Sequence, residues 1–191
     1  MINRVLIRIK VVQMLYSYLL TREGFKLYEA PEVGTKSRKY AYSLYCDLLM
    51  SILYLSGNGA VRRLVNVPGV GDNKYISANR LAKILGADTD MKAIIKSNAE
   101  HFVAFSDVLY SLQETITKSG AYRSYIRKKN AGLEEDAVFW GVVVDTIFGK
   151  SPELIAAARK NPDFSLAGFQ QALGMVEQSI KGIAGTKVGY I

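Results

Sequence analysis

Residues 3–20 read NRVLIRIKVVQMLYSYLL, and the spacing of their apolar side chains predicts a helix. These side chains fall into two stripes, with intervals that follow a helical period and not a strand period. The first stripe consists of Val5, Ile9, Val12, Tyr16 and Leu19. The second consists of Ile7, Val11, Met14 and Tyr18. A helix that is apolar on two sides is usually enclosed in a bundle, so this stretch points to an all-α fold.

Helical signals continue through most of the remaining chain. From about Ser37 to Leu55 apolar residues recur every three or four positions, and Gly57 is a suitable C-terminal stop. Between Gly57 and Lys74 the signals are those of turns. Further helices are expected to start at Ser77, at Asp88 or Asp90, at Ser106, near Tyr122, at Leu133, at Ser151, and at Asp163 or Ser165. We therefore expect a multi-helix bundle of about seven or eight helices.

The expected organisation has four parts. Residues 1–56 form a helical hairpin with a basic first helix, and residues 57–76 form an irregular connection. Residues 77–184 form a helical region packed on that hairpin, and residues 185–191 are a tail without obvious structure.

The charge balance points to polyanionic partners. The chain has 191 residues, a formal net charge of +8 and a pI of about 9.5. Such a balance favours nucleic acid or anionic lipid through long-range attraction and counterion release. The single cysteine, Cys46, excludes a disulfide within the chain and fits a reducing compartment.

The start of the chain superficially matches a signal peptide, because Arg4, Arg8 and Lys10 precede the apolar stretch Val11–Leu20. That stretch contains polar residues, and no A-x-A-like cleavage site follows it. It is also too short to span a bilayer, which takes about 20 apolar residues. We expect a cytoplasmic protein that does not bind a membrane.

The basic residues of the first helix could contact an external anion. Arg4 and Arg8 lie four residues apart and share one side, and Lys10 lies about 120° from Arg4. Cations near the start of a helix oppose its dipole, so a sequence that keeps them could be using them on a partner. The other interpretation is a solvated end of a core helix, and the residues alone leave both open.

Two further basic clusters invite the same question. Lys36, Arg38 and Lys39 open the second helix. The densest run comprises Arg123, Arg127, Lys128 and Lys129, interleaved with Tyr122 and Tyr125. Basic and aromatic residues together could contact phosphates and stack on unpaired bases. The favoured interpretation of this run is a solvated helix end, where cations suit the helix dipole.

Signals for catalysis or metal binding are weak. Gly69-x-Gly71 lacks the rest of a phosphate-loop motif and is interpreted as a turn. His101 is the only histidine and has no cysteine near it in sequence. The acids at Glu134, Glu135 and Asp136 fit a helix start. We expect no enzyme, no metal and no cofactor, although a deep polar pocket that holds His101 would reopen the question.

The opening residues carry a resemblance to a known family. Arg8-x-x-Val11-Val12-Gln13-x-Leu15-Tyr16, with Arg4 four residues ahead, resembles the pattern R-x-x-x-R-x-x-A-x-Q-x-L-Y of the NusB transcription antitermination proteins. This resemblance implies an all-helical fold without catalytic residues or cofactor. It also implies that the first helix binds the boxA element of ribosomal RNA leader transcripts. The implied partners are NusE, a small-subunit ribosomal protein, and the transcription elongation complex.

A longer NusB branch found in Bacteroidetes-type bacteria is similar over more of the chain. Asp72-Asn73-Lys74-Tyr75-Ile76 and the helix from Glu135 to Trp140 resemble that branch. The family's usual C-terminal half, with its D-R-x-x-L-R-like motif, is not evident. We expect either a shortened chain or a member that lacks this half, with homodimerisation as one way to cover the apolar surface left over.

The sequence therefore predicts an RNA-binding antitermination factor resembling NusB. The residues expected to contact RNA are Arg4, Arg8, Lys10, Lys36, Arg38, Lys39, Arg127 and Lys128. The alternative is a helical protein-interaction module that docks a ribosomal or transcription-complex protein without binding RNA.

Overall fold

The computed structural model describes residues 27–28, 36–128 and 131–188, and within these it is all-helical with no strand, as predicted. The helix predicted for residues 3–20 lies outside the described residues. The helices are α2 (Lys36–Leu55), α3 (Gly59–Arg62), α4 (Lys74–Ser77), α5 (Arg80–Ala87), α6 (Thr89–Ser97), α7 (Ala99–Phe105), the 3-10 helix η1 (Ser106–Val108), α8 (Leu109–Lys118), α9 (Gly120–Arg127), α10 (Leu133–Thr146), the 3-10 helix η2 (Phe148–Lys150), α11 (Pro152–Arg159) and α12 (Leu166–Val188).

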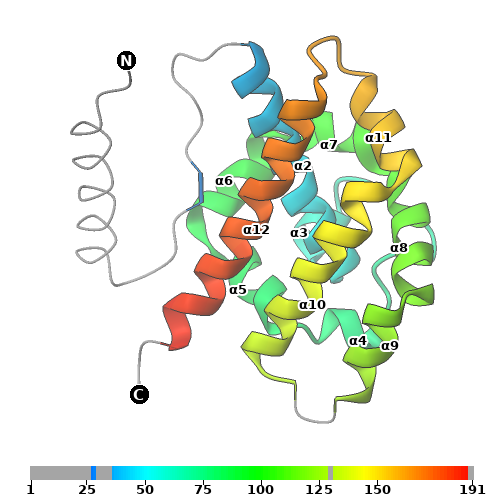
Figure 1. Cartoon of the computed structure of the whole chain (residues 1–191), viewed down its shortest axis with the longest axis vertical. Coiled ribbons are helices and arrows are strands. Elements are labelled where there is room, and N and C mark those ends of the chain that lie inside the picture. Colours follow the sequence, from blue (N-terminus) through cyan, green and yellow to red (C-terminus); the bar gives the residue numbers. More distant parts are fainter. Residues whose placement is uncertain (1–26, 29–35, 129–130, 189–191) are drawn as a thin grey trace.

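Helix α2 is the centre of the described fold. Every residue from Leu44 to Leu55 is buried, including the polar Asp47 and Ser51. A helix enclosed on all sides must be apolar nearly all round, which explains the run of Leu, Ile, Met and Tyr here. Helix α12 packs along α2, and α10 packs against α12, as Figure 1 shows. A hydrogen bond of 2.8 Å between the Tyr45 and Ser179 hydroxyls ties α2 to α12.

The end of α2 confirms Gly57 as its stop. The Asn58 N–H donates to Leu53 O and the Gly57 N–H donates to Tyr54 O, which together close a Schellman motif. Gly57 has a φ of +77°, a conformation that glycine adopts without strain. The helix therefore ends where the sequence indicates.

The expected connection 57–76 is more ordered than predicted. It contains α3 and α4, each of one turn, and its middle is held by side chains. The Tyr54 hydroxyl donates to Val65 O and accepts from Val67 N–H. The Gln113 side chain of α8 accepts from Gly71 N–H at 2.9 Å and donates to Gly69 O at 2.6 Å. With φ near +74° and +83°, these two glycines form a turn, as predicted.

The helix starts are partly as predicted. Asp88 caps α6 and Ser151 caps α11, with Pro152 at the first helical position. Ser77 as the cap of the next helix is wrong, because Ser77 ends α4 and Asn79 caps α5. Helix α8 ends at Lys118, and Ser119 then caps α9, which begins at Gly120. Short caps thus divide the chain into more helices than predicted.

A buried carboxylate joins three helix ends at the opposite side of the bundle from the start of α2. Asp136, on the first turn of α10, accepts from the Tyr125 hydroxyl at 2.6 Å and from Arg80 N–H at 2.7 Å. Asn79 donates to the same Tyr125 hydroxyl at 3.2 Å. Because every group named here has a partner, this cluster fixes the packing of α5, α9 and α10.

Helix α12 continues to Val188, past residue 184 and into the tail that the sequence predicts for residues 185–191. Among the described helices, none combines the length and apolar character needed to cross a membrane.

Candidate functional site

The described residues of the two basic clusters lie at opposite ends of the molecule. Lys36, Arg38 and Lys39 are exposed on the first turn of α2, at the top of Figure 1. Arg127 and Lys128 are exposed at the end of α9, at the bottom. Arg4, Arg8 and Lys10 lie outside the described residues. The structure therefore does not bring the two described clusters together.

The three basic residues of the α2 cluster do not all lie on the same side of the helix. At about 100° per residue, Lys36 and Lys39 lie on the same side of α2 as Tyr40, Ser43 and Asp47. Arg38 lies about 200° round from Lys36, on the opposite side. Lys36 and Lys39 thus lie at the exposed end of a face of α2 that becomes buried as the helix enters the core.

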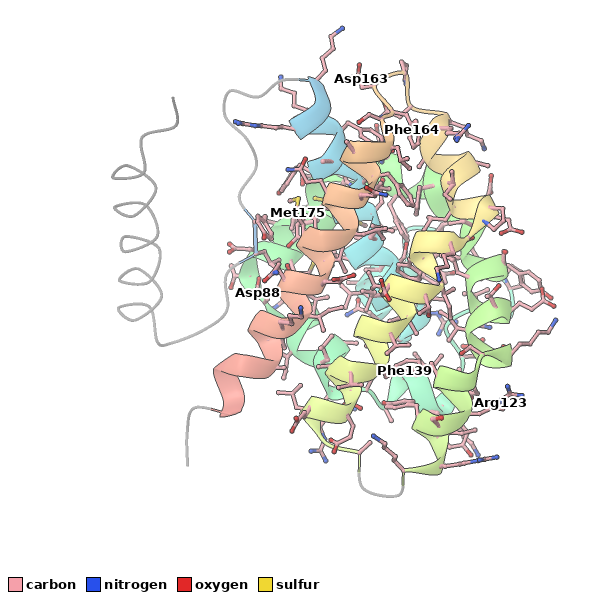
Figure 2. The ribbon with its side chains drawn as sticks, viewed as in Figure 1. Asp88, Arg123, Phe139, Asp163, Phe164 and Met175 are labelled. Carbon is pink, nitrogen blue, oxygen red and sulfur yellow. The ribbon has the colours of Figure 1, made fainter. Side chains whose placement is uncertain are left out.

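That face of α2 lines a cavity of about 290 Å³. The other walls come from α7, from the end of α11, and from the turn that follows α11. The apolar lining includes Leu44, Ala104, Phe105, Ala157 and Ala158, and the polar lining includes Tyr40, Ser43, Asp47, His101, Lys160 and Asn161. In Figure 2 the turn marked by Asp163 and Phe164 lies at the same end as the start of α2.

An ion pair between Asp47 and His101 forms one side of the cavity. Asp47 Oδ2 lies 2.7 Å from His101 Nδ1, and Asp47 Oδ1 accepts from the Asn98 amide at 2.8 Å. The Asp47 side chain is only 1% exposed, whereas that of His101 is 48% exposed. The pair therefore links the core to the cavity surface.

Burial and the contact between the two residues shift the pKa values of this pair. Desolvation raises the pKa of Asp47, although His101 and Asn98 oppose the shift by favouring the carboxylate. The hydrogen bond to Asp47 raises the pKa of His101, against a smaller opposing effect of burial. With Nδ1 directed at Asp47, the Nε2 edge of the imidazole is the one left for a ligand.

Tyr40 supplies an unsatisfied polar group beside the pair. The residue is 4% exposed, and its hydroxyl has no hydrogen-bond partner among the described residues. Burial, together with the Asp47 charge, raises the pKa of Tyr40 to about 12, so the hydroxyl keeps its proton. A buried hydroxyl without a partner costs about 1–3 kcal/mol, so its persistence at a cavity wall needs an explanation.

The Tyr40 ring is held in place from the other side. Phe164 meets it edge-on with ring centroids 5.8 Å apart, and the Arg159 guanidinium lies 5.4 Å from the Phe164 centroid. A Cβ at Gly168, on the first turn of α12, would lie 2.9 Å from Tyr40 Cδ1. Gly168 therefore makes room for the ring that carries the hydroxyl.

The cavity holds an acid–base pair but, among the described residues, no activated serine. Asp47 and His101 form an acid–base pair and Ser43 lines the same cavity, but no hydrogen bond joins Ser43 to His101 among the described residues. An activated serine requires that bond. Within residues 27–28, 36–128 and 131–188, no three His, Cys, Asp or Glu side chains gather as metal ligands would.

The sequence prediction did not find this site. It named His101 as an isolated histidine and placed no role on Tyr40, Asp47 or Lys160. One signal was available: Asp47 interrupts the apolar run of α2, and a buried carboxylate needs a partner. The partner lies 54 positions away on another helix, and periodicity carries no information about such pairs.

Comparisons of the chain with protein-family models, with curated proteins and with solved structures find no match.

Proposed function

We propose that this chain is an RNA-binding transcription antitermination factor resembling NusB, which binds boxA-like leader RNA of ribosomal RNA operons. The observation that carries the RNA-binding part is the first turn of α2. Lys36, Arg38 and Lys39 are exposed there, the turn contains no acid, and none of the three has an ion-pair partner among the described residues.

The dipole of α2 makes this arrangement unfavourable without a partner. The N-terminal end of a helix carries a partial positive charge, so cations there destabilise it by about 0.3–1 kcal/mol each. A polyanion bound at this end would offset that cost. The first turn of α2 thus places cations at the start of a helix, as the sequence predicts for Arg4 and Arg8.

The run at the end of α9 supports RNA binding less well. Arg127 lies in the last turn of α9, where a cation complements the helix dipole. Backbone hydrogen bonds lower the pKa of Glu135, and the charge of Lys128 lowers it further. Both cations therefore already have favourable interactions within the fold.

The antitermination assignment depends on the opening motif. The test is binding of a labelled boxA-like RNA, with a scrambled RNA of equal length as control, across a range of salt concentrations. Each phosphate neutralised on a single strand contributes about 0.7 to the slope of log K against log salt. We expect a steep slope and a marked loss of affinity in the Arg4→Ala/Arg8→Ala variant. Salt-independent binding, or unchanged affinity in that variant, would contradict the proposal.

A protein-interaction module is the second candidate. Val138 and Val142 lie four residues apart on α10, with 57% and 38% of their surfaces exposed. Such a pair on an outer helix face suits contact with an apolar partner surface. Capture of purified NusE that survives nuclease treatment and the Arg4→Ala/Arg8→Ala change, but is lost in Val138→Ser/Val142→Ser, would favour this candidate.

A further inference from the structure

The cavity between α2, α7 and α11 opens beside cations that nothing in the described fold neutralises. Lys36 and Lys39 continue the cavity-lining face of α2 outward, and Lys160 is exposed while lining the cavity itself. A chain of phosphates crossing this end of the molecule would pass the mouth of the cavity. The positions and charges of these three lysines thus point to a cavity ligand that is attached to a polyanion.

The polar groups of the cavity favour a ligand with both donors and acceptors. The Tyr40 hydroxyl can donate. With Nδ1 of His101 on Asp47, Nε2 accepts when the imidazole is neutral and donates when it is protonated. A phosphate or carboxylate would be repelled by Asp47, and an ammonium group would be repelled by protonated His101. The edge of a nucleobase carries both kinds of group and fits this mixture.

The apolar walls and the size of the cavity fit the same ligand. Ala104, Phe105, Ala157 and Pro162 offer surface for a flat ring. The cavity of about 290 Å³ lies at the lower end of the range of about 300–1,000 Å³ for small-ligand pockets. It is therefore suited to one ring system. Sequence-specific RNA recognition commonly inserts an unpaired base into such a site.

We propose that this cavity binds one unpaired nucleobase of the RNA, with the Tyr40 hydroxyl and His101 contacting the base edge and Lys36, Lys39 and Lys160 contacting adjacent phosphates. This inference rests on the proposed RNA binding, and it adds the place in the fold at which the protein recognises one base.

The first experiment removes the unpartnered hydroxyl. Tyr40→Phe deletes a buried group without a partner, so the free energy of unfolding is expected to stay the same or to rise slightly. Binding of the boxA-like RNA is expected to weaken by about fivefold or more, because a hydrogen bond to the base edge is lost. Unchanged RNA affinity in a folded Tyr40→Phe protein would overturn the proposal.

The second experiment fills the cavity. Ala157→Leu places a larger side chain in the wall, and Ala156→Leu is the matched control because Ala156 is exposed on the same helix and does not line the cavity. The cavity variant is expected to lose roughly tenfold or more in RNA affinity, the usual contribution of one bound base, while the control binds like wild type. Equal affinities of the two variants would overturn the proposal.

Single abasic substitutions along the RNA identify the base. One position is expected to weaken binding to the wild-type protein by the same factor as Ala157→Leu, and the two changes together are expected to weaken it no further. If instead every abasic RNA responds equally in the wild type and in Ala157→Leu, no base enters the cavity.

Two outcomes separate this proposal from the proposed function. RNA binding that depends on Lys36 and Lys39 but not on Tyr40 or Ala157 would overturn the base pocket alone. Binding of adenosine monophosphate that is lost in Tyr40→Phe, without any binding of RNA, would identify a free nucleotide as the ligand. That second outcome would overturn the RNA-derived base and the proposed function together.

Discussion

Asp47 and His101 determine how the cavity responds to pH. The folded chain holds the His101 proton more tightly than the unfolded chain, because the Asp47 hydrogen bond raises the pKa of His101 above 6.5. The resulting stabilisation is complete below the unfolded pKa and is lost as pH rises through the folded pKa. The raised pKa of Asp47 acts in the same direction, since ionising a buried carboxyl costs free energy.

We therefore predict that the free energy of unfolding, measured by urea denaturation, falls as the pH rises above 6.5, the ordinary pKa of histidine. His101 is the only histidine in the chain, so no second imidazole titrates in this range. Asp47→Asn, which keeps the imidazole but removes the cause of its shift, should flatten the profile, as should His101→Gln. A wild-type profile that is flat, or that rises with pH, would contradict this account of the pair.

The same two residues show where prediction from sequence stops. Caps such as Asp88 and Ser151 are local, because the side chain bonds a backbone N–H two or three residues away, and they could be predicted. Asp47 and His101 meet only after α2 and α7 have packed. The unpartnered Tyr40 hydroxyl is likewise a property of the packed helices and has no signature in the sequence.

Helix α12 supports the cavity through a close approach to α2. A Cβ at Gly168 would lie 2.9 Å from both Tyr40 Cδ1 and Ser165 Oγ, whereas a Cβ at Gly174 on the same helix would meet nothing within 4 Å. We predict that Gly168→Ala destabilises the chain by about 1–3 kcal/mol through overpacking, whereas Gly174→Ala stabilises it by about 0.5–1 kcal/mol through helix propensity.

Thermal or urea unfolding of the two glycine variants checks this prediction, with each variant acting as the control for the other. Gly168→Ala should also weaken RNA binding, since it displaces the Tyr40 ring. Equal stabilities would show that the close packing of α12 on Tyr40 does not matter to the fold.

Helix α2 combines a stable core segment with an electrostatically unfavourable start. Replacing Lys36 and Lys39 by glutamate should raise the free energy of unfolding by about 0.3–1 kcal/mol per position, because acids complement the helix N-terminus. The same double variant should lose RNA binding. A variant that is destabilised would indicate that these lysines serve the fold and not a partner.

The periodicity of α2 was enough to predict the helix and its end at Gly57, but not its enclosure. Its stripe of Tyr40, Leu44, Leu48, Ile52 and Leu55 predicts one buried face. In the structure every residue from Leu44 onward is buried, because α12 and several shorter helices pack around it. How many neighbours a helix acquires is decided by tertiary packing, which a single-sequence pattern does not encode.

At the scale of the molecule, the described residues of the two basic clusters lie at opposite ends, and this separation gives the account its sharpest test. Lys36 and Lys39 lie at the end with the cavity, and Arg127 and Lys128 lie at the other end (Figure 1). Net charge alone would make either pair equally important for RNA binding. A specific site at the start of α2 would make them unequal.

The most direct measurement is therefore the RNA affinity of two charge-matched variants, Lys36→Gln/Lys39→Gln and Arg127→Gln/Lys128→Gln. Each lowers the formal net charge from +8 to +6. We predict that the first variant loses roughly tenfold or more in affinity for the boxA-like RNA and shows a salt slope smaller by about 1.4, whereas the second binds like wild type. Equal losses in the two variants, or a larger loss in the second, would contradict an RNA site at the start of α2.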